Sequence, residues 1–215
     1  MALDFYHGHG SPFSWRVWLA LEAKAIPYNL KVLSFQEKDT RKPEFSAINP
    51  RQQVPTIVDD GHALWESMAI LEYLDERFST GLKLYPGDAR ARARIRRLAA
   101  EVQSYVRQEA IDPIVDEYFW KDGAAPDEAR IAKAREALTR ELKWFAGELK
   151  GSYLAGEQPT AADFMLYPEI GYAKRITFRK PESKLTDLVP PALAAWAKRI
   201  ESQPYFDKTF PPHWR

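Results

Sequence analysis

Hydrophobic and polar positions in the N-terminal part of the chain follow first a strand pattern and then a helical one. Residues 3–6 form a short apolar run and residues 28–33 largely alternate between apolar and polar side chains, both typical of strands, and residues 17–24 between them are mostly strong helix formers. The helix is expected to end before Pro27, which cannot continue it. Because a helix separates the two strands, we expect them to be parallel.

A hairpin and a second helix follow. Residues 53–64 predict two short strands joined across Asp60-Gly61, since an Asp-Gly pair supplies the positive φ angles that a tight turn needs. From residue 66 to residue 78, apolar positions recur at helical spacing. The predicted order over residues 1–79 is therefore β-α-β-β-β-α.

The rest of the chain has a helical period. Residues 80–88 are rich in turn-forming residues and predict a linker between an α/β domain over residues 1–79 and an all-helical domain over residues 89–215. The long helices are expected over residues 88–121, 126–149, 160–177 and 190–202. Thr160 is followed by Asp163 and an apolar run, which is a capping-box variant that we assign to folding of the helical half.

Charge balance and the absence of cysteine narrow the chemistry. The 215 residues carry 31 Lys and Arg against 30 Asp and Glu, so neither nucleic acid nor an anionic membrane is the expected partner. Without cysteine there is no disulfide, thiolate metal site or cysteine nucleophile, so any sulfur that reacts must arrive with a ligand. The sequence has neither a leader pattern nor an apolar run long enough to span a bilayer, and we expect a cytoplasmic protein.

The turn between the first strand and the first helix is the main candidate for chemistry. Ser11 is a natural N-cap, and Pro12 is a natural first helical residue. The Ser11 hydroxyl would then lie beside unpaired N–H groups at the positive end of a helix dipole, a place that favours an anion such as a thiolate. The alternative is that Ser11 only caps the helix.

Other polar residues near this turn have simpler explanations. We interpret Tyr6 as a half-buried core residue, although an early tyrosine could also donate to a thiol, and whether Ser14 assists Ser11 stays open. His7 and His9 lack neighbours of the metal-ligand kind and are expected in a loop, with His9 lining the site. Alternating arginines in the first long helix suggest a phosphate patch, but a solvated or interface helix is favoured because they spread over several faces. They are Arg90, Arg92, Arg94, Arg96 and Arg97.

Four segments, in this order, resemble the motifs of cytosolic glutathione transferases. They are the active-site turn at residues 11–17, residues 53–56 at the family's cis-proline, residues 66–67 in its glutathione-binding turn, and residues 160–163 in its helical domain. The resemblance implies a thioredoxin-like α/β domain, an all-α helical bundle, glutathione as co-substrate, no metal, and a homodimer. The resemblance is to bacterial-type members of the family that have a serine in the active site. The active-site turn at residues 11–17 has both omega-like and zeta-like features.

The resemblance also implies roles for individual residues. Ser11 would donate a hydrogen bond to the sulfur of glutathione, and a cis Val54-Pro55 bond would expose the Val54 backbone to pair with the tripeptide. Ser67 would receive the γ-glutamyl carboxylate, and Glu66 would pair with the ammonium group. The glycyl end is assigned to Gln53 and Lys42, and an electrophile pocket to Phe13, Tyr105, Gln108 and the tail at Trp214.

Several alternatives stay open. Lys42 could instead be a solvated loop charge, and Ser67 could be a second helix cap. The expected activity is transfer of glutathione to a small apolar electrophile, and the same thiolate could reduce peroxides. The rival functions are a glutathione-dependent isomerase or dehalogenase of the zeta type, and a non-catalytic ligand-binding or interaction module with the same fold. The presence of Ser11, Glu66 and Ser67 together favours an enzyme.

Overall fold

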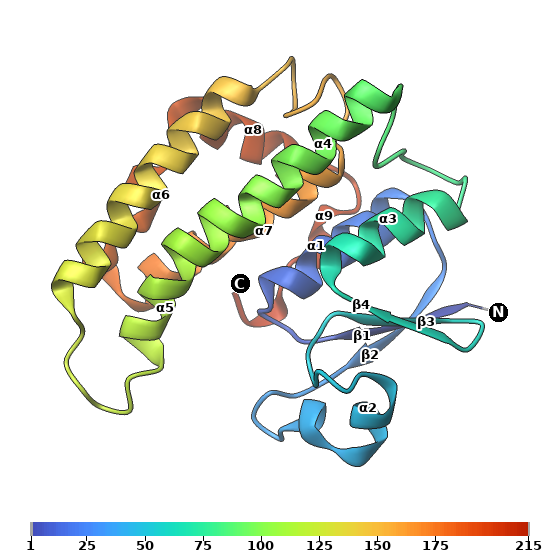
Figure 1. Cartoon of the computed structure of the whole chain (residues 1–215), viewed down its shortest axis with the longest axis horizontal. Helices are drawn as coiled ribbons and strands as arrows, with labels where there is room; N and C mark the ends of the chain where they lie inside the picture. Colours follow the sequence, from blue (N-terminus) through green and yellow to red (C-terminus); the bar gives the residue numbers. More distant parts are fainter. Residues whose placement is uncertain (1, 215) are drawn as a thin grey trace. The chain divides into compact units, whose positions relative to one another are not determined.

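The computed structural model describes residues 2–214 (Figure 1). Its contacts divide the chain into two compact units, one formed by residues 2–86 together with 204–214 and the other by residues 87–203. The sequence analysis assigned residues 204–214 to the helical half. The structure instead places this tail in the first unit, where its aromatic side chains gather around Trp15 of the first helix.

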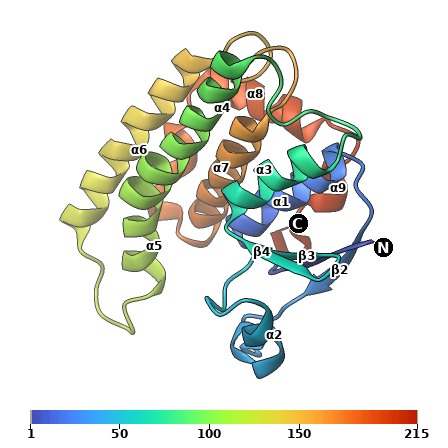
Figure 2. The same ribbon diagram turned by 45° about the vertical axis from the view of Figure 1, so that its right-hand side comes forward.

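The first unit is a small mixed sheet with helices on both faces, and Figure 2 shows α1 and α3 on one face and α2 on the other. Its strands are β1 (Leu3–His7), β2 (Tyr28–Val32), β3 (Thr56–Asp59) and β4 (His62–Trp65), and its helices are α1 (Pro12–Ala23), α2 (Pro43–Ile48), α3 (Ser67–Arg77) and α9 (Phe206–Thr209). Over the described residues the strand order is β2-β1-β3-β4, with β1 parallel to β2 and antiparallel to β3. The predicted β-α-β-β-β-α order is confirmed, while α2 and α9 are short helices that the sequence analysis did not predict.

The alternation of side chains along β1 explains how the sheet is covered. Phe5 and His7 are buried, and the His7 ring lies 4.5 Å from the ring of Trp18 on α1. Tyr6 points to the opposite face, where its ring lies 5.5 Å from that of Phe45 on α2. Successive strand residues therefore serve two different cores.

The structure shows how two segments predicted from the sequence are held, the hairpin between β3 and β4 and the linker over residues 80–88. The hairpin between β3 and β4 turns at Asp60 and Gly61, whose φ angles are 48° and 82°, so the predicted Asp-Gly turn is confirmed. The segment predicted as a linker is fixed to the first unit, because a carboxylate of α3 holds it. Asp75 accepts hydrogen bonds from the N–H groups of Leu84 and Tyr85 at 2.8 and 3.0 Å and pairs with Lys24 at 3.0 Å.

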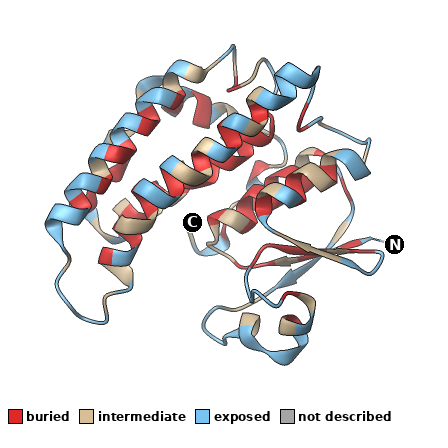
Figure 3. Cartoon of the chain, in the orientation of Figure 1, coloured by how far each residue is buried: buried red, intermediate tan, exposed pale blue. Residues whose placement is uncertain are grey.

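The second unit is helical. It contains α4 (Ala89–Glu101), a π-helical stretch (Val102–Ile111), α5 (Asp112–Phe119), α6 (Glu128–Glu148), α7 (Ala161–Arg179) and α8 (Pro191–Glu201). Figure 3 shows buried positions following one side of α6 while its opposite side is exposed, as expected for an amphipathic surface helix. The predicted α/β half followed by an all-helical half is confirmed.

The capping-box variant at the start of α7 is confirmed as a folding element. The Asp163 carboxylate is fully buried and accepts hydrogen bonds from the Thr160 N–H and hydroxyl, both at 2.8 Å. Its other oxygen accepts from the Leu154 N–H at 2.9 Å and from the Trp196 indole at 2.8 Å. Burial raises the pKa of Asp163, and these four donors oppose that shift. One side chain thus ties the start of α7 to α8 and to the preceding loop.

Candidate active site

The register of the sheet brings three of the predicted segments to one end of it. Tyr6 near the end of β1 pairs with Thr56 at the start of β3, and Thr56 pairs with Trp65 at the end of β4. Three segments therefore lie at the same end of the strands. They are the turn that follows β1, the proline that precedes β3 and the residues that follow β4. These are the segments that contain Ser11, Pro55 and Ser67.

The turn after β1 is built around Ser11, which caps α1 as predicted. Its Oγ accepts a hydrogen bond from the Ser14 N–H at 3.2 Å, and Pro12 is the first helical residue. Because the hydroxyl oxygen accepts from Ser14, its hydrogen can donate to a ligand. The first turn of α1 contains no acidic residue, so the positive end of the helix is not neutralised there. Ser11 is partly exposed, whereas Ser14 is fully buried and receives the Gly8 N–H at 3.5 Å.

The start of α3 carries the second part of the site. Ser67 is the first helical residue and is buried, while Glu66 before it is exposed and has a φ of 69°, a left-handed value that is unusual for a residue with a Cβ. Arg16 of α1 donates from Nη1 to Ser67 Oγ at 3.2 Å. The Arg16 guanidinium is buried and lies 4.6 Å from the centre of the Phe13 ring. The sequence analysis gave Arg16 no separate role, although a lone charge in the apolar run of α1 could have drawn attention to it.

The predicted cis peptide bond between Val54 and Pro55 is present. Both residues are buried, whereas the Gln53 side chain is exposed. The Gln53 carbonyl accepts hydrogen bonds from Asn49 Nδ2 at 2.8 Å and from Thr56 Oγ1 at 3.1 Å. The backbone that enters β3 is therefore held by side chains on both sides of the proline.

Lys42 lies in an exposed loop. Its ammonium pairs with the Asp39 carboxylate at 2.6 Å, and the same carboxylate accepts the Ser34 N–H at 2.8 Å. The hydrogen bond to Asp39 raises the pKa of Lys42. This local pairing accords with the solvated-loop interpretation, and contact with a glycyl carboxylate stays a prediction.

His7 and His9 form a pair inside the turn, with 3.0 Å between His7 Nε2 and His9 Nδ1. The expectation that His7 is a loop residue was wrong: it is the last residue of β1 and is buried, because β1 extends farther than the apolar run in the sequence. Burial, assisted by the nearby His9, lowers the pKa of His7 to about 3, and burial also lowers the pKa of His9. Both rings are therefore neutral at physiological pH, and neither supplies a positive charge to the turn. Tyr6 packs on Phe45 as a partly buried residue of the opposite face.

The residues predicted to line an electrophile pocket are found in both units. Phe13 is partly exposed on the first turn of α1. Tyr105 and Gln108 are exposed on the π-helical stretch, where Tyr105 lines a surface groove with Trp144 of α6. Trp214 packs edge-on against Trp15, with ring centres 5.5 Å apart. The pocket itself stays a prediction.

Two of the arginines of the suggested phosphate patch connect helices of the second unit. Arg94 pairs with Glu148 at the end of α6 at 2.5 Å, and it also donates to the Leu154 carbonyl at 3.1 Å. Arg97 pairs with both Glu101 and Glu148 at 2.7 Å. These contacts favour the interpretation of α4 as a helix whose charges are used within the fold.

Neither a metal-binding cluster nor a membrane-spanning helix is found in residues 2–214. Within this range, no three His, Asp or Glu side chains are grouped so that they could hold a metal ion. None of the helices described there is long and apolar enough to cross a membrane.

Comparison with known families gives two matches that together span most of the chain. The model described as "Glutathione S-transferase, N-terminal domain" matches residues 10–77, and the model described as "Glutathione S-transferase, C-terminal domain" matches residues 96–204. The first match contains the turn at Ser11, the cis-proline and the start of α3. The second contains the π-helical stretch and the buried carboxylate of Asp163.

Individual relatives agree with these matches over nearly the full length. Glutathione S-transferase A of Pleuronectes platessa is 32% identical over 213 residues, which cover 96% of this chain and 90% of the relative. Glutathione S-transferase D7 of Drosophila melanogaster is 28% identical over 210 residues, covering 93% and 89%. Among solved structures, glutathione transferase F7 of Populus trichocarpa superposes with a TM-score of 0.80 at 27% identity, covering 97% of both chains. A glutathione S-transferase of the Antarctic clam Laternula elliptica gives 0.81 at 27% identity, covering 100% and 94%.

Proposed function

The chain belongs to the glutathione S-transferase family and is a glutathione S-transferase, and we propose that it ionises the thiol of glutathione at Ser11. The observation that carries this proposal is the geometry of the cap. The Ser11 oxygen is engaged by the Ser14 N–H, which leaves its hydrogen to donate to a ligand at the positive end of α1. The glutathione sulfur supplies the thiol that the chain itself lacks.

The energy that this ionisation requires is modest. A free thiol with a pKa of about 8.5 is only a few per cent ionised at neutral pH, and each unit of depression requires about 1.4 kcal/mol of preferential stabilisation of the thiolate. A hydrogen bond from a hydroxyl to an anion, together with a helix N-terminus, supplies about 1–3 kcal/mol. Ser11 therefore acts as a donor to the sulfur, and glutathione is the nucleophile.

We assign the remaining glutathione contacts mainly to residues that lie at the same end of the strands as Ser11. The Val54 backbone next to the cis-proline pairs with the tripeptide backbone like an added strand. The Ser67 hydroxyl and N–H receive the γ-glutamyl carboxylate, and Arg16 fixes the orientation of that hydroxyl. Glu66 pairs with the ammonium group. Gln53 and Lys42 serve the glycyl end.

The thiolate attacks a small apolar electrophile or reduces a peroxide. Phe13, Tyr105 and Gln108 are the residues we assign to the electrophile pocket. Serine at position 11 disfavours chemistry through a mixed disulfide with the protein, because a hydroxyl cannot form one. The cytoplasmic location and the homodimer expected from the sequence are part of the same proposal, and the isomerase, dehalogenase and non-catalytic binding functions remain its rivals.

The test is an ultraviolet titration of the thiolate of bound glutathione in wild type and in Ser11→Ala, with binding measured for both. We expect a depressed thiol pKa in wild type that rises by about one unit or more in Ser11→Ala. Ser79→Ala, at an exposed serine of the same unit, is the matched control and should titrate like wild type. An unshifted pKa in both wild type and Ser11→Ala would reduce Ser11 to a helix cap, and failure to bind glutathione at all would favour the binding module.

A further inference from the structure

The tail formed by residues 204–214 is anchored on the helix that carries Ser11. Trp15 is buried, and its indole N–H donates to Thr209 Oγ1 at 3.1 Å. The rings of Phe210 and Trp214 pack edge-on against it, with centre distances of 5.7 and 5.5 Å. Edge-to-face pairs of this kind are favourable beyond the area they bury. The tail is thus held at the first turns of α1 by one aromatic side chain.

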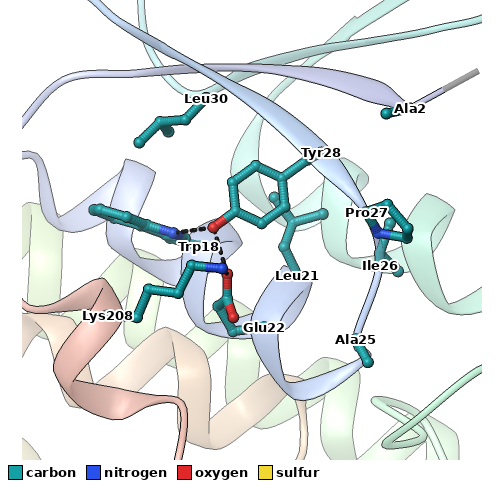
Figure 4. Close-up of a pocket in the computed structure, with 10 residues that line it drawn as sticks. All are labelled: Ala2, Trp18, Leu21, Glu22, Ala25, Ile26, Pro27, Tyr28, Leu30 and Lys208. Atoms are coloured by element: carbon teal, nitrogen blue, oxygen red, sulfur yellow. Dashed lines mark hydrogen bonds and ion pairs between the residues drawn. The ribbon is translucent and has the colours of Figure 1, made fainter.

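A second anchor lies farther along α1. Lys208 of the tail pairs with Glu22 at 2.5 Å, and its ammonium lies 5.2 Å from the centre of the Tyr28 ring. The Tyr28 hydroxyl accepts the Trp18 indole N–H at 2.7 Å and donates to Glu22. Figure 4 shows these side chains at a surface cavity of about 550 Å³. Since its polar groups are engaged with one another, we interpret this cluster as an anchor for the tail and assign no ligand to the cavity.

Between them, the two anchors fix the last residues of the tail against the active-site turn. A Cβ built on Gly10 would lie 2.9 Å from His213 Nε2 and 3.5 Å from Trp214 Nε1. Gly10 directly precedes Ser11 and has a φ of 86°, so both its backbone and the space beside it require glycine. Figures 1 and 2 show the C-terminal end of the chain near the N-terminal end of α1.

We propose that His213 is a further residue of the glutathione site, where its imidazole takes up the proton that leaves the thiol. This inference rests on the proposed function. The thiol S–H bond breaks, the proton passes to the imidazole directly or through a water molecule, and the imidazolium and thiolate form an ion pair while Ser11 donates to the sulfur. After the sulfur has bonded to the electrophile, the imidazolium returns the proton to solvent or to the leaving group.

The other titratable groups near the tail do not take this role. His7 at the end of β1 and His9 in the turn bond to each other, and burial disfavours their protonation. Glu22 and Lys208 neutralise each other at the second anchor. His213 is the histidine that the tail itself brings to the turn.

The experiment measures both the thiol pKa and the fate of its proton. Glutathione is titrated into wild type, Ser11→Ala, His213→Gln and His62→Gln by calorimetry at neutral pH, in two buffers of different ionisation enthalpy, while the thiolate is followed by its ultraviolet absorbance. We expect wild type to form thiolate without releasing a proton to the buffer. His213→Gln should raise the thiol pKa by about one unit and release about one proton for each thiolate formed.

The controls separate this inference from the proposed function. His62→Gln, at an exposed histidine of the same unit, should behave like wild type. Wild-type behaviour of His213→Gln, or an equal effect of His62→Gln, would overturn the role of His213. If Ser11→Ala raises the thiol pKa in that case, the proposed function stands alone; if Ser11→Ala has no effect, the proposed function itself fails.

Discussion

Arg16 donates from Nη1 to the Oγ of Ser67 at 3.2 Å, and this bond joins the helix that begins after Ser11 to the helix that begins at Ser67. The guanidinium is fully buried and stacks on Phe13, so its orientation is set by packing as well as by hydrogen bonding. Arg16 thereby connects the two ends of the proposed glutathione site, at Ser11 and at Ser67.

The first prediction follows from this contact. Arg16→Met keeps much of the apolar volume but removes the donor, so Ser67 loses its fixed hydroxyl orientation. We expect the KM for glutathione to rise about ten-fold, while the pKa of the bound thiol changes little because Ser11 is untouched. The unfolding free energy should fall by about 2–4 kcal/mol, since a buried charged network is broken.

Steady-state kinetics and urea denaturation measure the two effects. Arg90→Met, at an exposed position of α4, serves as control, and a KM equal to that of wild type would contradict the role assigned to Arg16.

Local signals in the sequence were sufficient for much of the fold. The Asp60-Gly61 turn, the cap at Ser11 and the carboxylate of Asp163 each depend on residues a few positions apart, which periodicity and capping rules detect. The cis bond before Pro55 was predicted only through the family resemblance, because an X-Pro pair alone does not specify its isomer.

The errors and omissions arise from long-range contacts. Arg16 and Ser67 are separated by 51 positions, and Trp15 and Thr209 by 194, so no local pattern indicates either pair. The tail was assigned to the helical half because it follows helices in the chain, whereas its aromatic side chains pack on Trp15. His7 was expected in a loop because it lacks neighbours of the metal-ligand kind, yet it ends β1 and its ring lies 4.5 Å from that of Trp18.

The second prediction concerns pH and stability. Burial, with a contribution from His9, lowers the pKa of His7 to about 3, whereas a histidine in the unfolded chain has a pKa of about 6.5. Between these values the unfolded state binds a proton that the native state excludes, so stability falls as the pH falls. We expect His7 to account for a loss of about 2 kcal/mol between about pH 7.5 and about pH 5.

Urea denaturation of wild type and His7→Gln over this pH range tests the prediction. The variant is expected to be less stable at neutral pH because a packed ring is lost, but its stability should depend less steeply on pH. His62→Gln, at an exposed histidine of β4, should keep the wild-type slope. Equal slopes for wild type and His7→Gln would show that His7 does not titrate as described.

The third prediction concerns the buried carboxylate at the start of α7. In Asp163→Asn, one of the two acceptor oxygens becomes an NH2 group, which cannot accept the N–H and hydroxyl hydrogens that Thr160 now donates or those from Leu154 and Trp196. We expect a loss of about 3 kcal/mol in unfolding free energy. Asp187→Asn, at an exposed position, should change stability by less than about 0.5 kcal/mol. Thermal and urea denaturation measure both, and similar losses in the two variants would show that the hydrogen bonds to Asp163 are not what stabilises the start of α7.

The fourth prediction is that the protein is a homodimer whose interface includes the groove between the π-helical stretch and α6. Tyr105 and Trp144 line this groove and remain 45% and 50% exposed, so an interface at the groove would remove apolar surface from water. Charged residues surround them, as is common at the rim of an interface. They are Glu101, Glu109, Arg140 and Glu141. Truncating or charging a central aromatic residue of an interface costs about 2–4 kcal/mol, so Trp144→Arg should weaken association by a factor of about 100.

Size-exclusion chromatography with light scattering, at a concentration of about 1 µM, decides between the possible outcomes. Wild type should elute as a dimer and Trp144→Arg as a monomer. Trp120→Arg is the matched control, because Trp120 is 73% exposed at the end of α5 and lies outside the groove. If the Trp120 variant dissociates and the Trp144 variant does not, the interface lies on another face. A wild-type monomer would instead remove the dimer from the proposal.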